Sequence, residues 1–364
     1  MDVHAAAMRP DRRACTPVIW SSALVLVVAA CSSEDPAQAG GETPTFGTIE
    51  AVPFVRLPVS ANQVDRPFSG IVGAHRLRGG SIVVADASQT LRWFDATGRP
   101  GRTVGVGAQG AEADRALMWM RGYRGDSLIA YEAASGQLSV FDAQGLLARR
   151  FRFATDALPG FILPDSPFPD GSILAMVGPS HVQERRDGWW AVLQLVTFTP
   201  EGHPAARLGT ALRHPCGNAV EHCAAELNPY SGTWTAGLTG AYTARPDVTD
   251  LRLVSSDSAL VLKGPVGWER PAQEPLPTYS RLLLDSEGDL WAQSGDLSRA
   301  AVFDRHGEFT GTIRVPAELQ IYQVGPDFVL GVVEDTAGEH VQIHRLDRTL
   351  QEVRGAHSAA APSS

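Results

Sequence analysis

A glycine-rich segment is the first place where residue types and spacing could do chemistry. Gly105, Gly107 and Gly110 form a G-x-G-x-x-G pattern, in which backbone N–H groups can surround a phosphate. A nucleotide site also needs a strand before this loop and a helix after it. Both flanks are typical of strands, so we expect a connecting loop. The chain lacks Gly-x-Ser-x-Gly and His-Glu-x-x-His, and we assign no catalytic residue and no cofactor.

A second candidate is a cysteine at the end of an apolar leader. Arg9, Arg12 and Arg13 precede an apolar run over 18–28 that is too short for a comfortable membrane span. Val-Ala-Ala then leads directly to Cys31, an order that resembles the lipobox of bacterial lipoproteins. In that class, lipid is attached to the cysteine thiol and cleavage falls just before it. The alternatives are an ordinary secretory signal and an uncleaved anchor.

The residues around Cys31 imply a layout and an address. We expect a signal peptide over 1–30 and a lipidated Cys31 with a polar tether to residue 46, rich in Ser, Glu, Pro, Ala and Gly. Ser32 beside the cysteine resembles the sorting rule for the outer membrane, on its periplasmic side or at the cell surface. The expected partners are therefore the membrane, through the lipid, and an envelope protein, peptide or glycan.

Two further cysteines, Cys216 and Cys223, lie close together in the body. In an exported protein, a local disulfide closing this loop is the expected chemistry. His214 and His222 make a Cys2His2 metal site conceivable, but their spacing matches no common zinc pattern. No metal ligand is assigned on this basis.

Composition excludes some partners. The formal net charge is −9 and no Lys/Arg run stands out, so nothing recommends nucleic acid. The hydrophobic fraction of 44% is ordinary for a soluble globular chain, and 36 glycines with 25 prolines favour many turns and short strands.

The elements that must position any site are predicted by a repeat, Phe-Asp-x-x-Gly. In this pattern an aromatic residue ends a buried strand, Asp caps the turn and Gly takes the left-handed position. Copies begin at Phe94, Phe141 and Phe303, with a looser copy at Phe198. The spacings are 47, 57 and 105 residues, so one turn is missing. We place that missing turn near Trp268.

A second repeated element precedes these turns, and it is a polar turn followed by an apolar strand. Its six copies cover 80–84, 126–130, 171–175, 257–261, 288–292 and 326–330. Six units of several short strands indicate an all-β fold, a six-bladed β-propeller, over residues 47–350. We expect the strand Ile49–Val55 to complete the last blade from outside, and 351–364 to be a disordered tail.

The pattern resembles the NHL-like and TolB-like six-bladed propellers of bacteria. The residues that carry the resemblance are 84–86, 91–98, 105–110 and 283–291. The resemblance implies a fold more than a function. The third unit departs from the pattern by an insertion and the fourth by the lost turn.

Several other side chains are candidates for a binding site. The insertion over 178–190 could form a ligand-binding lip; we expect Trp190 to pack between blades and leave Trp189 open. Asp86, Asp285 and Glu334 could line an axial channel, or could simply cap turns.

These features predict a membrane-anchored binding or scaffold module of the cell envelope. The alternative is a propeller hydrolase or lyase with a metal at the central channel, as some related propellers are. That alternative would require acidic and histidine side chains converging on the axis.

Overall fold

The computed structural model describes residues 43–57, 68, 70–106, 117–154, 158, 160–185, 188–215, 233–244, 249–265, 268, 278–336 and 338–348. These residues form six antiparallel sheets and no helix. The described residues therefore contain no helix that could span a membrane. The leader with Cys31, the tail after 348 and both Cys216 and Cys223 lie outside the described residues.

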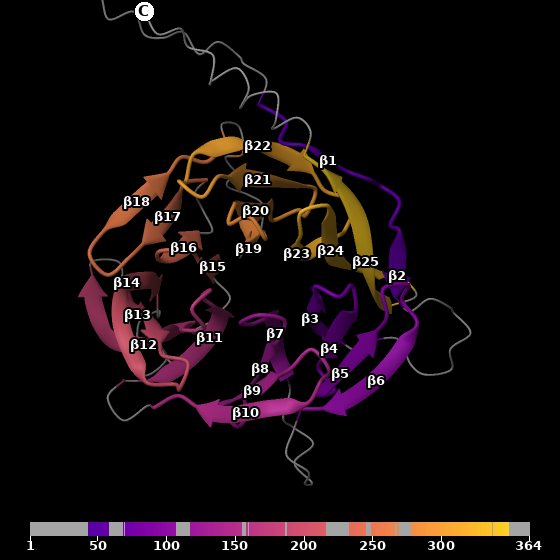
Figure 1. Cartoon of the computed structure of the whole chain (residues 1–364). Coiled ribbons are helices and arrows are strands. Elements are labelled where there is room, and N and C mark those ends of the chain that lie inside the picture. Colours follow the sequence, from indigo (N-terminus) through magenta and orange to yellow (C-terminus); the bar gives the residue numbers. More distant parts are fainter. Residues whose placement is uncertain are drawn as a thin grey trace, which may run out of the picture. The chain divides into compact units, whose positions relative to one another are not determined.

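Five sheets are four-stranded meanders and the sixth has five strands, and all six are arranged as blades around one axis (Figure 1). Blade one has strands β3 (Ile71–Arg76), β4 (Ile82–Asp86), β5 (Thr90–Phe94) and β6 (Pro100–Gly105). Blade two has β7 (Leu117–Gly122), β8 (Leu128–Glu132), β9 (Gln137–Phe141) and β10 (Leu147–Arg152). Blade three has β11 (Phe161–Pro167), β12 (Ile173–Arg185), β13 (Gly188–Phe198) and β14 (Pro204–Pro215). The expected six-bladed propeller is thus the observed fold.

The remaining blades follow the same order. Blade four has β15 (Thr233–Ala236), β16 (Ala241–Ala244), β17 (Leu251–Val254) and β18 (Ala259–Leu262). Blade five has β19 (Tyr279–Leu284), β20 (Leu290–Ser294), β21 (Arg299–Phe303) and β22 (Phe309–Arg314). Blade six has β23 (Gln320–Val324), β24 (Phe328–Asp335) and β25 (Gly338–Asp347). The first strand of each blade lies nearest the axis (Figure 1).

The last blade is completed by the N-terminal part of the described chain. Strand β1 (Thr48–Ile49) pairs with β25 at Leu346–Asp347, and β2 (Val55–Leu57) pairs with it at Val341–Ile343. The expected outer strand is therefore present, in two pieces. This closure pairs the outer edge of β25 and joins the two ends of the propeller.

The repeated turns have the expected chemistry. In the first, the Asp95 carboxylate accepts hydrogen bonds from the backbone N–H groups of Thr97 at 2.8 Å and Arg99 at 3.0 Å. Gly98 has a φ of 87°, which is left-handed. These turns join the third strand of a blade to its fourth. The aromatic residue of the repeat is the last residue of the third strand, so it recurs together with the turn.

Blade four corrects two expectations. Residues 257–261 do form a polar turn and the start of an apolar strand, but this strand is the outer strand β18 and does not correspond to the second strands that the other copies begin. The lost turn is replaced at Ser255–Ser258, where Ser255 donates to the Asp257 carboxylate at 2.9 Å, and not near Trp268. The two hairpins of a blade share a pattern of a polar turn followed by an apolar strand, and this similarity caused the misassignment.

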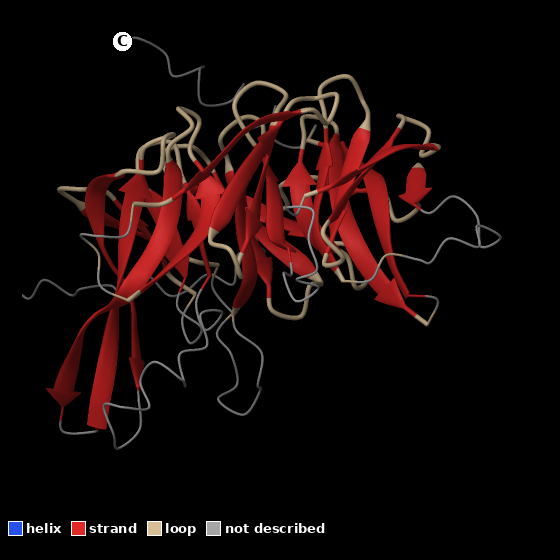
Figure 2. Ribbon diagram, turned by 90° about the horizontal axis from the view of Figure 1, so that it is seen from below, coloured by secondary structure: helices blue, strands red, loops and turns tan. Residues whose placement is uncertain are grey.

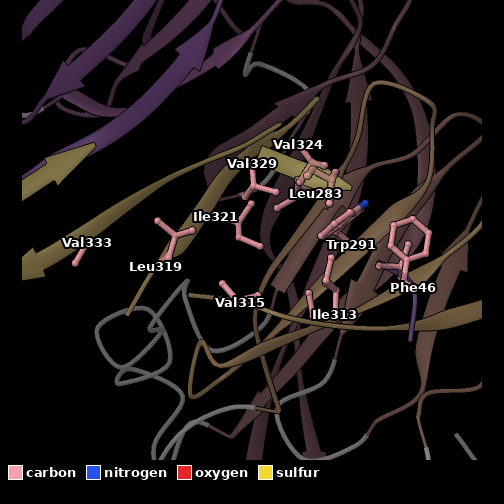
Figure 3. Packing of buried hydrophobic residues seen from close by; sticks show 13 residues of the cluster. Phe46, Leu283, Trp291, Ile313, Val315, Leu319, Ile321, Val324, Val329 and Val333 are labelled. Carbon is pink, nitrogen blue, oxygen red and sulfur yellow. The ribbon is translucent and has the colours of Figure 1, made fainter. Parts of the chain in front are cut away.

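Apolar side chains fill the space between neighbouring blades. Between blades five and six, Trp291 is fully buried and meets Phe46 edge-on, with ring centroids 5.6 Å apart (Figure 3). Because Phe46 precedes the closing strands, the N-terminal segment contributes to this core as well as to the sheet. Burial of side chains this large is the main source of stability between blades.

Candidate functional site

The inner strands enclose an axial cavity of about 930 Å³. Its wall combines residues of all six inner strands, and its mouth is lined by the loops that follow the inner strands of blades one to five. A volume of this size is typical of small-molecule sites. The cavity is therefore the candidate functional site.

The inner strands are irregular at the cavity wall. In five of them the pairing with the second strand shifts by one residue, leaving an extra residue in the inner strand. The extra residues are Val72, Met118, Asp165, Ser280 and Tyr322, and each lines the cavity. Such β-bulges redirect side chains and are frequent beside binding sites. Here they bring Asp165 and Tyr322 to the axis.

Hydrogen bonds between adjacent blades hold the wall in place. The Tyr322 hydroxyl of blade six donates to the Ile71 carbonyl of blade one at 3.0 Å. The Gln323 side chain accepts from the Arg76 N–H at 2.6 Å and donates to the Arg76 carbonyl at 3.2 Å. These contacts satisfy backbone groups that the blade sheets leave unpaired near the axis.

The opposite side of the wall is joined in the same way. The Trp119 indole of blade two donates to the Pro164 carbonyl of blade three at 2.7 Å. The Ser166 hydroxyl of blade three accepts from the Ala236 N–H of blade four at 2.7 Å. The cavity therefore has a pre-organised frame, which lowers the entropic cost of binding a ligand.

Two arginines carry the positive charge of the wall. Arg281 donates from Nη1 to the Ile321 carbonyl at 3.0 Å, and its guanidinium lies 4.0 Å from the centre of the Tyr322 ring. Arg121 donates from Nη1 to the Met120 carbonyl at 3.2 Å. A guanidinium has five N–H donors, so in the described part of the chain both arginines keep most donors without a protein acceptor.

One carboxylate, Asp165, lies among these cations. Burial raises its pKa, while Arg121, Ser166 and Arg281 act in the opposite direction. Burial lowers the pKa of Arg121, and repulsion from Arg281 adds to that effect. Within the described chain, Asp165 makes no ion pair with either arginine, so the two guanidinium charges are only partly compensated.

His75 completes the titratable groups of the wall. Burial lowers its pKa to about 4; the nearby Asp126 acts against this change and Arg121 adds to it. Its imidazole packs against the Gly122 backbone, where any Cβ would collide with the ring. At neutral pH the histidine is therefore uncharged and can donate and accept hydrogen bonds.

Two of the carboxylates selected from the sequence, Asp86 and Glu334, do not line the cavity. Asp86 caps the turn after β4: Oδ1 accepts from the Ser88 N–H at 3.0 Å and the Thr90 hydroxyl at 3.0 Å, and Oδ2 lies 3.1 Å from Arg92. Glu334 is exposed near the end of the β24–β25 hairpin, away from the cavity lining. Neither can act at the axis.

Asp285 lies at the cavity mouth, but its oxygens already have partners. Oδ1 accepts from the N–H groups of Glu287 and Asp289, each at 2.9 Å. Oδ2 accepts from the Trp291 indole at 3.0 Å and from Arg348 at 2.9 Å. Asp285 therefore caps a turn, in agreement with the second interpretation of these carboxylates.

Other sequence candidates contribute nothing to the described site. In the glycine-rich segment, Gly105 ends β6 and Val106 is buried, while 107–116 fall outside the description. The next described element is strand β7. The insertion lengthens β12 and β13, which project beyond the other sheets (Figure 2). The side chains of Trp189 and Trp190 are outside the description.

Sequence reasoning missed the residues that do line the axis. Arg121, Asp165 and Arg281 each interrupt a short apolar run just before a repeated polar turn. That position corresponds to the inner strand of a propeller blade, and a charge there is the signal that could have identified them.

No family model and no curated protein matches the chain. Among solved structures, a member of the DUF4221 family from Bacteroides vulgatus aligns with a TM-score of 0.56, 10% identity, 83% of this chain and 99% of that chain. This likeness shows the fold alone. A candidate exported protein from Bacteroides fragilis aligns with a TM-score of 0.46, 11% identity, 83% of this chain and 95% of that one.

A virginiamycin B lyase from Staphylococcus aureus gives a TM-score of 0.43 and 9% identity, with 76% of this chain and 94% of that chain covered. The likeness to the DUF4221 structure supports the propeller fold alone, so the chemistry of the cavity must be argued from its own residues.

Proposed function

We propose that this protein is a lipid-anchored binding module of the bacterial cell envelope whose ligand site is the axial cavity. The observation that carries the binding role is the cavity of about 930 Å³, with a hydrogen-bonded frame and guanidinium donors that have no acceptor among the described residues. The anchor is supported by the leader, the small residues and the cysteine that end at Cys31.

The donor set of the wall favours binding over metal chemistry. A metal-dependent hydrolase or lyase needs several carboxylate or imidazole ligands converging on one point. On the described inner strands, the charged or titratable side chains that line the cavity are His75, Arg121, Asp165, Arg281 and Tyr322. Two of these are permanent cations, which oppose a divalent ion.

The binding role is tested on the full chain, extracted from membranes in mild detergent. Native mass spectrometry should find a small molecule bound to the folded protein, and metal analysis should find no stoichiometric metal. A stoichiometric metal that is lost on Asp165→Asn substitution would instead favour the enzyme. Finding neither a bound molecule nor one in a screen of envelope metabolites would contradict the binding role.

The anchor has a separate test. Cells fed an alkyne fatty acid should label the wild-type protein and the Cys216→Ala variant equally, because Cys216 lies in the body. Cys31→Ala should carry no label and should be released from the membrane fraction. Label retained by Cys31→Ala would overturn the lipid anchor.

A further inference from the structure

The charge of the axial cavity is opposite in sign to that of the protein. The chain carries a formal net charge of −9. The cavity lining nevertheless contains four arginines and three carboxylates: Arg78, Arg121, Arg124 and Arg281 against Asp165, Asp285 and Glu287.

Two of those carboxylates are compensated from outside the cavity. Arg348 lies 2.9 Å from Asp285 and 3.1 Å from Glu287, and it is not part of the lining. Among the lining carboxylates, that leaves Asp165 to offset Arg121 and Arg281, while Arg124 interacts with Asp170 outside the lining. The cavity therefore presents positive charge within an acidic molecule, which attracts small anions.

The two axial arginines are arranged for recognition rather than for structural pairing. Arg281 is fixed by one carbonyl and by the Tyr322 ring, and its other N–H donors have no acceptor among the described residues. Arg121 is fixed by one carbonyl on its own strand. Planar guanidinium edges bind carboxylate and phosphate oxygens in pairs.

The arginines also repel each other, which raises the free energy of the empty cavity. An anion that accepts hydrogen bonds from both would remove that repulsion and use the free donors at once. The rest of the lining mixes polar residues such as Ser280 with apolar and aromatic ones, which include Leu163, Phe168 and Trp234. Such a wall suits an organic body attached to the anionic group.

We infer that the axial cavity binds a small organic anion, held through its carboxylate or phosphate by Arg121 and Arg281. This inference rests on the proposed binding role and names the class of ligand. Asp165, on a bulge between the blades that bear these arginines, limits the excess positive charge and disfavours ligands of high negative charge.

The test uses full-length protein in detergent and three probes of similar shape: phenyl phosphate, phenylacetate and neutral benzyl alcohol. Isothermal titration should detect binding of one or both anions, and binding of benzyl alcohol at least tenfold weaker. Comparison of the affinities for phenyl phosphate and phenylacetate distinguishes phosphate recognition from carboxylate recognition. Added salt should weaken the anion binding.

Arg121→Gln and Arg281→Gln should each weaken anion binding about 10- to 100-fold, since each removes charge-assisted hydrogen bonds. Arg314→Gln, an exposed change on the outer strand β22, is the matched control and should leave affinity unchanged. In ligand-free buffer both axial variants should unfold at or above the wild-type temperature, because one of two repelling cations is gone.

Should a variant not fold, the wild-type protein still decides the question: anions must raise its unfolding temperature more than benzyl alcohol does. Equal effects of all three probes, or equal anion affinity in the axial and control variants, would overturn the inference. A co-purified neutral ligand would also overturn it, while leaving the proposed binding role intact.

Discussion

The Arg348 guanidinium lies 2.9 Å from the Asp285 carboxylate, and this ion pair ties the segment after the last strand to the first turn of blade five. The Asp285 side chain is fully buried and that of Arg348 is 11% exposed. Arg348 also contacts Glu287 at 3.1 Å and lies 5.7 Å from the centre of the Phe46 ring. One side chain thus joins blade five to both ends of the described chain.

Arg348→Ala should destabilise the propeller by about 2–4 kcal/mol, because it leaves the buried Asp285 carboxylate without its cation. Arg348→Lys should lose less stability than Arg348→Ala, since the positive charge beside Asp285 remains. Arg345→Ala is the control: its side chain is 69% exposed and its ion pair with Glu50 is 3.9 Å long. Urea unfolding at pH 7 measures all three, and equal loss in Arg348→Ala and Arg345→Ala would contradict the role of this ion pair.

The repeated turns explain how much of the fold was predictable. Asp95 and Gly98 must have these identities for local reasons, because one caps the turn and the other takes a left-handed φ. Local chemistry of this kind is visible in the chain, so the blade number and the closing strand could be predicted. Blade four could not be assigned correctly, because its Ser255–Ser258 turn uses other residues for the same task.

The axial site was not predictable to the same degree. Asp165 reaches the cavity through a bulge, and a one-residue shift in pairing leaves no mark on composition or periodicity. Arg121 and Arg281 lie 160 residues apart and share a cavity only because inner strands from all blades meet at the axis. The sequence left two interpretations open for Asp86, an axial role or a turn cap, and its hydrogen bonds within its own turn decide for the cap.

Asp289 should make the protein less stable as pH rises. Burial, with repulsion from Asp285, raises its pKa from 3.8 to about 6, and Arg348 only partly offsets this. The folded state therefore holds this proton more tightly than the unfolded state, and the stabilisation present below about pH 4 is lost as pH rises through about 6. Asp289→Asn should raise stability at pH 7 by about 1 kcal/mol after allowance for solvent screening.

The measurement for Asp289 is the free energy of unfolding across pH 4–7 in wild type and variant. The difference between the two should grow with pH over this range. Asp95→Asn, at an exposed turn where the carboxylate accepts two backbone hydrogen bonds, is the comparison and should destabilise instead. A pH-independent effect of Asp289→Asn would refute the raised pKa.

His75 should make the protein less stable as pH falls, the opposite of the effect of Asp289. Its pKa falls from 6.5 to about 4 on folding, mainly through burial. The unfolded state therefore binds the proton more tightly, so stability is lost as pH falls from about 6.5 towards 4. His75→Gln should remove this loss, worth about 1–2 kcal/mol, whereas His203→Gln at an exposed turn should not. An unchanged acid slope in His75→Gln would show that the imidazole is not held neutral.

The closing strand β2 gives the last prediction. Leu57 is fully buried and pairs with Val341 of β25, next to the exposed Arg56 on the same strand. Leu57→Ala should cost about 2–5 kcal/mol by leaving a cavity between blades six and one. Arg56→Ala breaks only an exposed ion pair with Asp335 and should cost less than about 1 kcal/mol. Limited proteolysis should cleave the Leu57→Ala chain near residue 58 before the rest of the propeller, since the outer strand separates first. Uniform cleavage along the variant would mean that the closure is not the weakest point of the ring.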